Sequence, residues 1–195
     1  MFFPATFRSA RKQLKSHGSE RGMTLVELMI TMVVMAVGLG GVMVMISTAI
    51  SSNHRNKMDT TATGVAQAVL EQVLAQPANV STTLTISDCN PAGATNWTVA
   101  TAGAASPGNG ATINTSTGGI DYTEAYSAIP ANYKMLYVGC GAAGQQATFD
   151  VRWNVTTITA FTRLVTVSAR QLQGGSTAGG LHFAPPVTLR SIGGV

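Results

Sequence analysis

The sequence predicts an α+β fold in which one long N-terminal α-helix is packed by an antiparallel β-sheet head. Three observations support this prediction: an uncharged apolar run over residues 28–50, a helical apolar stripe that continues to Gln76, and alternating strand patterns late in the chain. The expected organisation is a basic leader over 1–22 that is removed, a membrane-spanning helix over 23–50, its amphipathic continuation over 51–76, and a Thr- and Gly-rich β head over 77–195.

The net positive charge lies entirely in the leader. Of 12 basic and 8 acidic residues, five basic and one acidic precede Met23, so the remainder has seven of each. A basic stretch directly before an apolar run predicts a cytoplasmic N-terminus, with the rest of the chain outside. Nucleic-acid binding is not expected, because the remainder has no clustered Lys and Arg.

The apolar run is long enough to cross a bilayer. Its 23 residues carry no charge, and about 20 apolar residues span the hydrocarbon core as a helix. Beyond it, apolar residues recur at spacings of three and four, which predicts a helical face that packs on a core. These residues are Met58, Ala62, Val65, Ala66, Val69, Leu70, Val73 and Leu74. Because Pro77 disfavours helix at Gln76, a single helix over 24–76 is expected, about 80 Å long.

Alternating side chains predict an antiparallel hairpin packed on the long helix. Phe149, Val151, Trp153 and Val155 alternate with Thr148, Asp150, Arg152 and Asn154, and a second alternating run covers residues 164–169. Shorter strands are expected at 84–86, 97–99, 135–138 and 186–192. Between them, Ile113 is the only large apolar residue of a Thr-, Ala- and Gly-rich segment over 100–119, which predicts a surface loop with little to anchor it.

Catalytic and metal sites are not predicted. The three histidines, His17, His54 and His182, lie in the leader, the helix and a Gly-rich tail, and the acids of the head are scattered, as expected for surface charges or local caps. Asp88 begins a stretch that resembles a calcium loop, but Val99 stands where the last acid belongs, so a turn is favoured. We therefore expect no enzymatic activity, no cofactor and no metal.

Cys89 and Cys140 both follow the apolar run. In an oxidising compartment an even pair commonly closes a disulfide, and neither thiol has a Cys or His at metal-ligand spacing. A disulfide is favoured, with two unpaired thiols as the alternative.

The junction between leader and apolar run contains Glu27, a carboxylate at the head of an apolar helix. Such an acid needs a partner. A cut between Gly22 and Met23 would create an amine at Met23 that relieves the desolvation of the carboxylate, within one helix or between adjacent subunits. The alternative is an ordinary secretory signal cut after the small residues at 47–49, or no cut at all, which would give a secreted or membrane-anchored binding domain.

The segment RGMTLVELMITMVVMAVGLGGVMVMISTA resembles the class III signal of type IV prepilins and the related pseudopilins, since Gly22, Thr24, Leu25 and Glu27 match the motif. The resemblance implies cleavage between Gly22 and Met23 by a prepilin peptidase, N-methylation of Met23 by the same enzyme, and a role of Glu27 in processing and assembly. Two features depart from the family. Met23 stands where Phe is usual, and three glycines replace the usual Pro in the middle of the helix.

The late strands FDVRWNV and LVTVSAR resemble those of minor pilins of the PilV kind, and Cys140 lies farther from the C-terminus than is usual in major pilins. A minor pilin is therefore favoured over the main filament subunit. A pseudopilin of type II secretion or of DNA uptake stays the nearest alternative, because it would share every N-terminal feature. The implied partners are other pilin subunits, the prepilin peptidase and the inner-membrane pilus assembly machinery. The implied location is the inner membrane for the precursor and a pilus or periplasmic filament afterwards.

Overall fold

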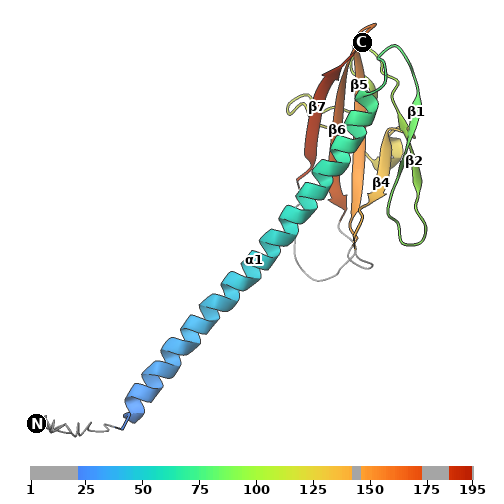
Figure 1. Ribbon diagram of the computed structural model, residues 1–195. Coiled ribbons are helices and arrows are strands. Elements are labelled where there is room, and N and C mark those ends of the chain that lie inside the picture. The colour runs from blue at the N-terminus through green and yellow to red at the C-terminus, as the bar shows by residue number, and fades with distance from the viewer. Residues whose placement is uncertain (1–21, 142–145, 173–184, 195) are drawn as a thin grey trace, which may run out of the picture. The chain divides into compact units, whose positions relative to one another are not determined.

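The computed structural model describes residues 22–141, 146–172 and 185–194 (Figure 1). The chain forms two compact units that meet between Ala49 and Ile50. One helix, α1 (Leu25–Leu74), begins in the first unit and ends in the second. The predicted α+β fold with a long N-terminal helix and antiparallel sheets is confirmed, and the helix differs from the expected span by one residue at its start and two at its end.

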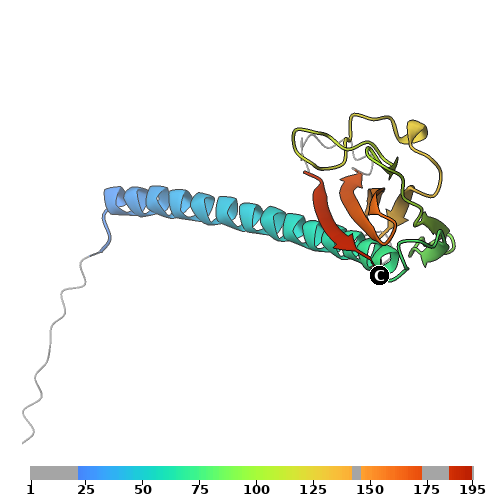
Figure 2. The same cartoon turned by 90° about the horizontal axis from the view of Figure 1, so that it is seen from above.

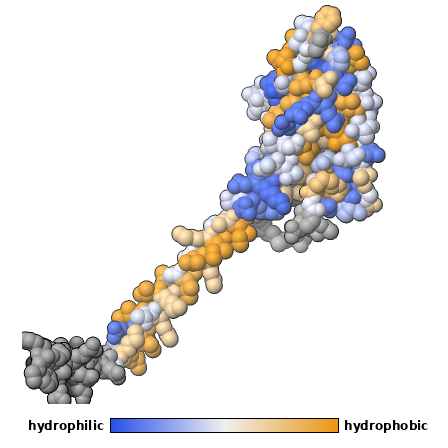
Figure 3. All heavy atoms as spheres, viewed as in Figure 1, coloured by the Kyte–Doolittle hydropathy of each residue, from blue (hydrophilic) through white to orange (hydrophobic). Residues whose placement is uncertain are grey.

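The first unit is an apolar helical segment. The N-terminal half of α1 is long and apolar enough to cross a membrane by length and composition, and none of its most apolar window is buried. Figure 3 shows hydrophobic residues along this half and a hydrophilic band where the polar residues 51–57 follow. Within the described residues, this part of the helix therefore presents apolar side chains on every side.

The second unit contains the end of α1 and two antiparallel sheets. The small sheet pairs β1 (Thr83–Ser87) with β2 (Asn96–Ala100). The large sheet has the order β3-β5-β6-β7, and β4 also pairs with β5. Its strands are β3 (Asn109–Gly110), β4 (Lys134–Val138), β5 (Thr148–Thr159), β6 (Thr162–Leu172) and β7 (Val187–Gly193). A short 3-10 helix, η1 (Tyr126–Ala128), lies between β3 and β4.

The core lies between α1 and one face of the large sheet. The helix buries the face that its spacing predicted, with Val69 and Val73 fully buried, while Leu74 is only partly buried. The sheet supplies Phe149 and Trp153 of β5 together with the valines of β5 and β6. The predicted hairpin of β5 and β6 packed on the helix is confirmed, because these alternate side chains form one core cluster with the helix residues.

Strand β5 is buried on both faces, which the sequence did not predict. Asp150, Arg152 and Asn154 are each only 2% exposed, so the expectation that the acids are surface charges is wrong for Asp150. The reason is a second cover, since the segment from Pro107 to Glu124 lies over the sheet face opposite α1 (Figure 2). Alternation of polar and apolar residues predicted a solvated face, but the polar residues pair with one another and with this segment instead.

The expected surface loop over residues 100–119 is firmly attached to the sheet, which corrects the prediction. Asn154 donates from Nδ2 to the carbonyls of Pro107 (3.2 Å) and Ala111 (2.9 Å), and β3 pairs with β5. Gly110 has a φ of +111°, and a Cβ there would lie 2.2 Å from the carbonyl oxygen of Trp153. A segment with few apolar residues is therefore held by hydrogen bonds to a polar strand face, and only glycine permits the closest approach.

The side chain of Arg163, on β6, caps the C-terminal end of α1 by hydrogen bonding. Its buried guanidinium donates to the carbonyls of Val73 and Gln76 and to that of Thr101 (3.0 Å), and no acid pairs with it in the described part of the chain. The last carbonyls of a helix lack intrahelical partners and carry partial negative charge, so a cation is stabilised there. Burial lowers the pKa of Arg163 below its usual value, but the carbonyl groups favour the charged form.

Replacement of Arg163 by Leu is expected to lower the free energy of unfolding of the head by about 2 kcal/mol. The variant leaves buried carbonyl groups of the helix end and of Thr101 without a donor, and each such group costs about 1–3 kcal/mol. Chemical denaturation of the full chain in detergent measures this. Arg163→Lys is the matched control and should retain part of the stability, since an ammonium reaches fewer carbonyls than a guanidinium. Equal stability of the Leu variant and the wild type would refute this role.

Candidate functional site

The candidate site for processing is the start of α1. Gly22, Met23 and Thr24 are exposed and precede the helix, which begins at Leu25. The backbone N–H of Glu27 donates to Thr24 Oγ1 (3.3 Å), and that of Leu28 donates to the Thr24 carbonyl (3.1 Å). Thr24 is therefore the N-cap, and its hydroxyl satisfies the amide of Glu27, which has no partner inside the helix. The predicted cleavage pair therefore lies just outside the helix, in an exposed part of the chain that a protease could reach.

Thr24 and Glu27 have the spacing of a capping box, a signal that the sequence analysis missed. In this T-x-x-E arrangement the N-cap hydroxyl accepts from the third helical residue, whose side chain can reach back to the N-cap amide. The structure shows the first of these bonds. Among the described residues, the Glu27 carboxylate accepts no hydrogen bond and forms no ion pair. It lies in the first turn, where the helix dipole favours negative charge, and it is free to bind a cation.

The surface of α1 after Glu27 is compatible with an apolar environment. Thr31 Oγ1 donates to the carbonyl of Leu28 (2.8 Å), and Thr48 Oγ1 donates to that of Met45 (2.9 Å), so both hydroxyls are satisfied inside the helix. Gly38, Gly40 and Gly41 have nothing within 4 Å of a built Cβ. Polar groups with internal partners are tolerated in hydrocarbon, and small residues let another helix approach closely. The structure therefore places no obstacle to lipid or helix packing here.

The head is cross-linked beside the turn of its small sheet. Cys89 and Cys140 form a disulfide with a Cα–Cα distance of 5.0 Å, which links the segment after β1 to the segment after β4. Next to it, Asp88 accepts hydrogen bonds from the backbone N–H of Thr95 (2.6 Å) and from the indole of Trp97 (3.2 Å). Both carboxylate oxygens thus receive N–H donors, which agrees with the predicted turn and not with a calcium loop.

Asp88 gives the head a predictable pH dependence. Burial raises the pKa of this carboxyl, but hydrogen bonds from Thr95, Trp97 and Asn90 outweigh burial, so the pKa lies below its usual value. A depressed pKa stabilises the fold at pH values above the unfolded pKa of about 4, and this stability is lost as the pH falls through the folded pKa.

The Asp88→Asn variant is therefore expected to be less stable than the wild type at neutral pH, and the difference should shrink below pH 4. Thermal unfolding of both proteins between pH 7 and pH 2.5 measures it. An effect that stays constant over this range would show that the loss comes from packing and not from charge.

A second polar cluster lies beneath the segment that covers β5. Asp150 binds Arg152 in a buried ion pair (2.7 Å), and Arg170 lies 3.4 Å from the same carboxylate. Both guanidinium groups stack on the ring of Tyr122, at 4.6 and 4.3 Å from its centre. Burial lowers the pKa of Arg152, but the hydrogen bonds and charge of Asp150 outweigh burial, so the pKa is raised. Burial and the charge of Asp150 also raise the pKa of Tyr126, to about 12. Each charged group has a partner, so the cluster holds the fold together.

The described residues contain no group of three or more His, Cys, Asp or Glu side chains that could hold a metal ion. His54 is exposed on α1, while His17 and His182 lie outside the described residues. The basic leader, apart from Gly22, also lies outside them.

The fold and the helix start define a class of protein: one apolar N-terminal helix followed by antiparallel sheets, the architecture of type IV pilin-like proteins. The family model described as the prokaryotic N-terminal methylation motif matches residues 18–43, which include Gly22, Met23 and Glu27. No curated protein and no solved structure matches the chain. The motif indicates a type IV pilin-like or pseudopilin precursor, and it favours a structural subunit over an enzyme.

Proposed function

We propose that this protein is a minor pilin, a structural subunit that is processed at Gly22–Met23 and assembled with other pilin subunits into a pilus. The observation that carries the proposal is the exposed dipeptide before a capped helix whose apolar surface has no partner in the described residues. That surface needs lipid before assembly and neighbouring helices afterwards. The methylation motif at the same residues supports this reading.

Processing would supply the missing partner of Glu27. Cleavage before Met23 creates an amine four residues from the carboxylate, and N-methylation by the prepilin peptidase retains its positive charge. Paired with the amine of an adjacent subunit, Glu27 would fix the axial stagger between neighbouring helices. The leader would hold the precursor in the inner membrane, with its N-terminus in the cytoplasm until the peptidase cuts, and the inner-membrane assembly machinery would then extract it.

The minor-pilin assignment is supported by the head. The disulfide links the segments after β1 and β4 and leaves β7, the last described strand, without a cross-link. In major pilins the disulfide usually lies near the C-terminus. The nearest alternative is a pseudopilin of type II secretion or of DNA uptake, which would share the processing site. Recovery from sheared surface pili, compared with retention in the cell envelope, distinguishes a pilin from a pseudopilin.

The test is the mass and N-terminal peptide of the mature protein from its native membrane. A start at Met23, with or without an added methyl group, is expected for the wild type, and Gly22→Val should keep the precursor intact because a branched side chain obstructs the cut. A start near Ile50, or an uncut wild-type chain, would overturn the proposal in favour of a secreted or membrane-anchored domain.

Removal of the charge at Glu27 is expected to prevent assembly into the pilus while cleavage at Gly22–Met23 still occurs. Glu27→Gln keeps the size of the side chain but cannot neutralise the new amine, so cleaved protein should remain in the membrane and be lost from the pilus fraction. Glu27→Asp, the matched control, keeps the charge and should be recovered in part. Immunoblots of membrane and sheared-pilus fractions measure this. Normal recovery of the Gln variant in pili would exclude the charge pairing.

A further inference from the structure

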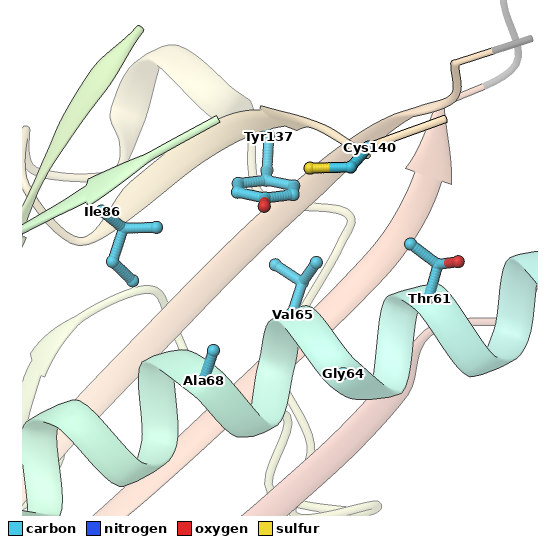
Figure 4. A pocket seen from close by; sticks show the side chains of 7 residues that line it. All are labelled: Thr61, Gly64, Val65, Ala68, Ile86, Tyr137 and Cys140. Atoms are coloured by element: carbon cyan, nitrogen blue, oxygen red, sulfur yellow. The ribbon is translucent and has the colours of Figure 1, made fainter. Parts of the chain in front are cut away.

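The two edges of the large sheet differ in what lies against them. At the β4 edge, the Cys89 amide donates to the Val138 carbonyl (3.1 Å), and the disulfide links the segments that follow β1 and β4. Here α1, the small sheet and β4 surround an apolar hollow of about 290 Å³, lined by Gly64, Ile86 and Tyr137 among others (Figure 4). Strand β7 forms the opposite edge, and no described strand pairs with its outer side (Figure 1).

The backbone groups on the outer side of β7 are those of Thr188, Arg190 and Ile192. In an antiparallel sheet, successive residues of a strand direct their N–H and C=O groups to alternate sides. The Trp153 amide of β5 donates to the Tyr133 carbonyl (3.1 Å), so the odd-numbered residues of β5 bond away from β6 and the even-numbered ones bond to β6. The register then leaves the odd-numbered residues of β6 to bond to those of β7. The N–H and C=O groups of the three even-numbered residues of β7 therefore point outward, and they have no partner among the described residues.

This edge is long, regular and exposed. Strand β7 pairs with β6 through seven consecutive residues without a register shift, and no proline lies within it. Thr188, Arg190 and Ile192 are all exposed, Ile192 by 65%. Native edges are usually blocked by short strands, bulges, prolines or charges, and of these features the described strand β7 has only the charge of Arg190. A row of unpaired N–H and C=O groups is matched by one kind of partner, another extended chain.

The position of Arg190 disfavours a second copy of this chain as that partner. Arg190 is the middle residue of β7. Pairing of β7 with β7 over all seven residues, antiparallel or parallel, would place Arg190 beside Arg190, and adjacent like charges on paired strands are destabilising. A shifted register would shorten the ladder. Arg190 forms no ion pair among the described residues, so an acidic residue on a different strand is its complementary neighbour.

We propose that the outer edge of β7 binds an extended strand of a different protein, which carries an acidic residue opposite Arg190 and apolar residues opposite Leu189 and Ile192. The strand pairs antiparallel, as all described strands of the head do. Main-chain hydrogen bonds supply the affinity, and the side-chain pairs across the two strands supply the specificity. The inference goes beyond the proposed function, since it gives the head a binding partner, and it does not depend on cleavage at Gly22–Met23.

Titration of the isotope-labelled full chain in detergent with the synthetic peptide TVTEVTV tests the edge. Paired antiparallel with β7, this peptide places Glu opposite Arg190 and Val opposite Leu189 and Ile192. The NMR signals of the Thr188, Arg190 and Ile192 amides should shift, and these amides should exchange more slowly with solvent. The amides of Leu189 and Ser191, which already bond to β6, should change little. The same peptide N-methylated at its second, fourth and sixth residues is the matched control, because it keeps the side chains but loses the donors, and it should not bind.

Exchange of charges tests the specificity. The peptide TVTKVTV should bind the wild-type chain several-fold more weakly than TVTEVTV, and Arg190→Glu should reverse this preference, because opposite charges across paired strands attract and like charges repel. Ile192→Pro removes an outward N–H without removing a bond to β6, so it should weaken the binding of TVTEVTV. Ile192→Val keeps that N–H and should bind as the wild type does.

Four results would overturn the inference. Absence of shifts with TVTEVTV would show that the edge does not accept a strand, and slow exchange of the Thr188, Arg190 and Ile192 amides in the free chain would show that it already has a partner. Equal binding of the N-methylated peptide would exclude main-chain pairing, and self-association of the wild type through β7 would exclude a different protein. None of these results alters the N-terminus of the mature protein, so the mass measurement tests the proposed function separately.

Discussion

Removal of the disulfide is expected to lower the free energy of unfolding of the head by about 4 kcal/mol. Cys89 and Cys140 are 51 residues apart in sequence, and closing a loop of this length restricts the unfolded chain by roughly that amount in the chain-entropy model. The bridge also ties the small sheet to β4, a tie otherwise made by the hydrogen bond from the Cys89 amide to the Val138 carbonyl (3.1 Å).

The measurement compares urea unfolding of the wild-type chain with that of the Cys89→Ser, Cys140→Ser double variant. Wild type treated with a reducing agent is the matched control, because its sequence is unchanged, and it should lose the same stability. A double variant as stable as the oxidised wild type would show that the bridge contributes nothing to the fold.

Replacement of Asp150 by Asn is expected to destabilise the head by about 3 kcal/mol or more. The substitution keeps the shape of the side chain but leaves the guanidinium of Arg152 buried without a counterion, which typically costs 3–5 kcal/mol. Arg152 also donates to the Glu124 carbonyl (2.8 Å), so its displacement should loosen the segment over β5.

Chemical denaturation gives the global effect of Asp150→Asn, and protease cleavage within residues 101–133 reports the local one. Asp59→Asn removes a charge that forms no ion pair among the described residues and should change stability by less than about 0.5 kcal/mol. If both variants behaved alike, the buried pair would not stabilise the covering segment.

The helix and the β5–β6 hairpin could be predicted because each depends on local periodicity. The spacing of Met58, Val65 and Val69 identifies the helical face that is buried, and alternation about Trp153 identifies the strand. Periodicity separates the polar face of an element from its apolar face, but it does not indicate which segment packs on the polar face. The burial of Asp150 and Arg152 follows from a segment more than 15 residues away in sequence, whose own residues give little sign of a packed state.

The candidate site was predictable in part. The positions of Gly22, Met23 and Glu27 follow from a linear motif, since they are consecutive or nearly so. The cap formed by Thr24 was available from the T-x-x-E spacing and was missed because Glu27 was considered only as an acid in hydrocarbon. The hollow near Gly64 could not be predicted, because it depends on the distance between the helix and strands that follow it.

The attachment of α1 to the sheet determines how the head would carry a mechanical load. A pull on the helix reaches the sheet along the whole buried stripe from Met58 to Val73 and, at the helix end, through the guanidinium of Arg163. The buried helix residues and the hydrogen bonds of Arg163 would have to slip along the sheet at the same time. The tension would therefore not pass through the chain connection that follows Leu74. The head would thus remain seated on its helix under traction, and the connection would be spared the strain.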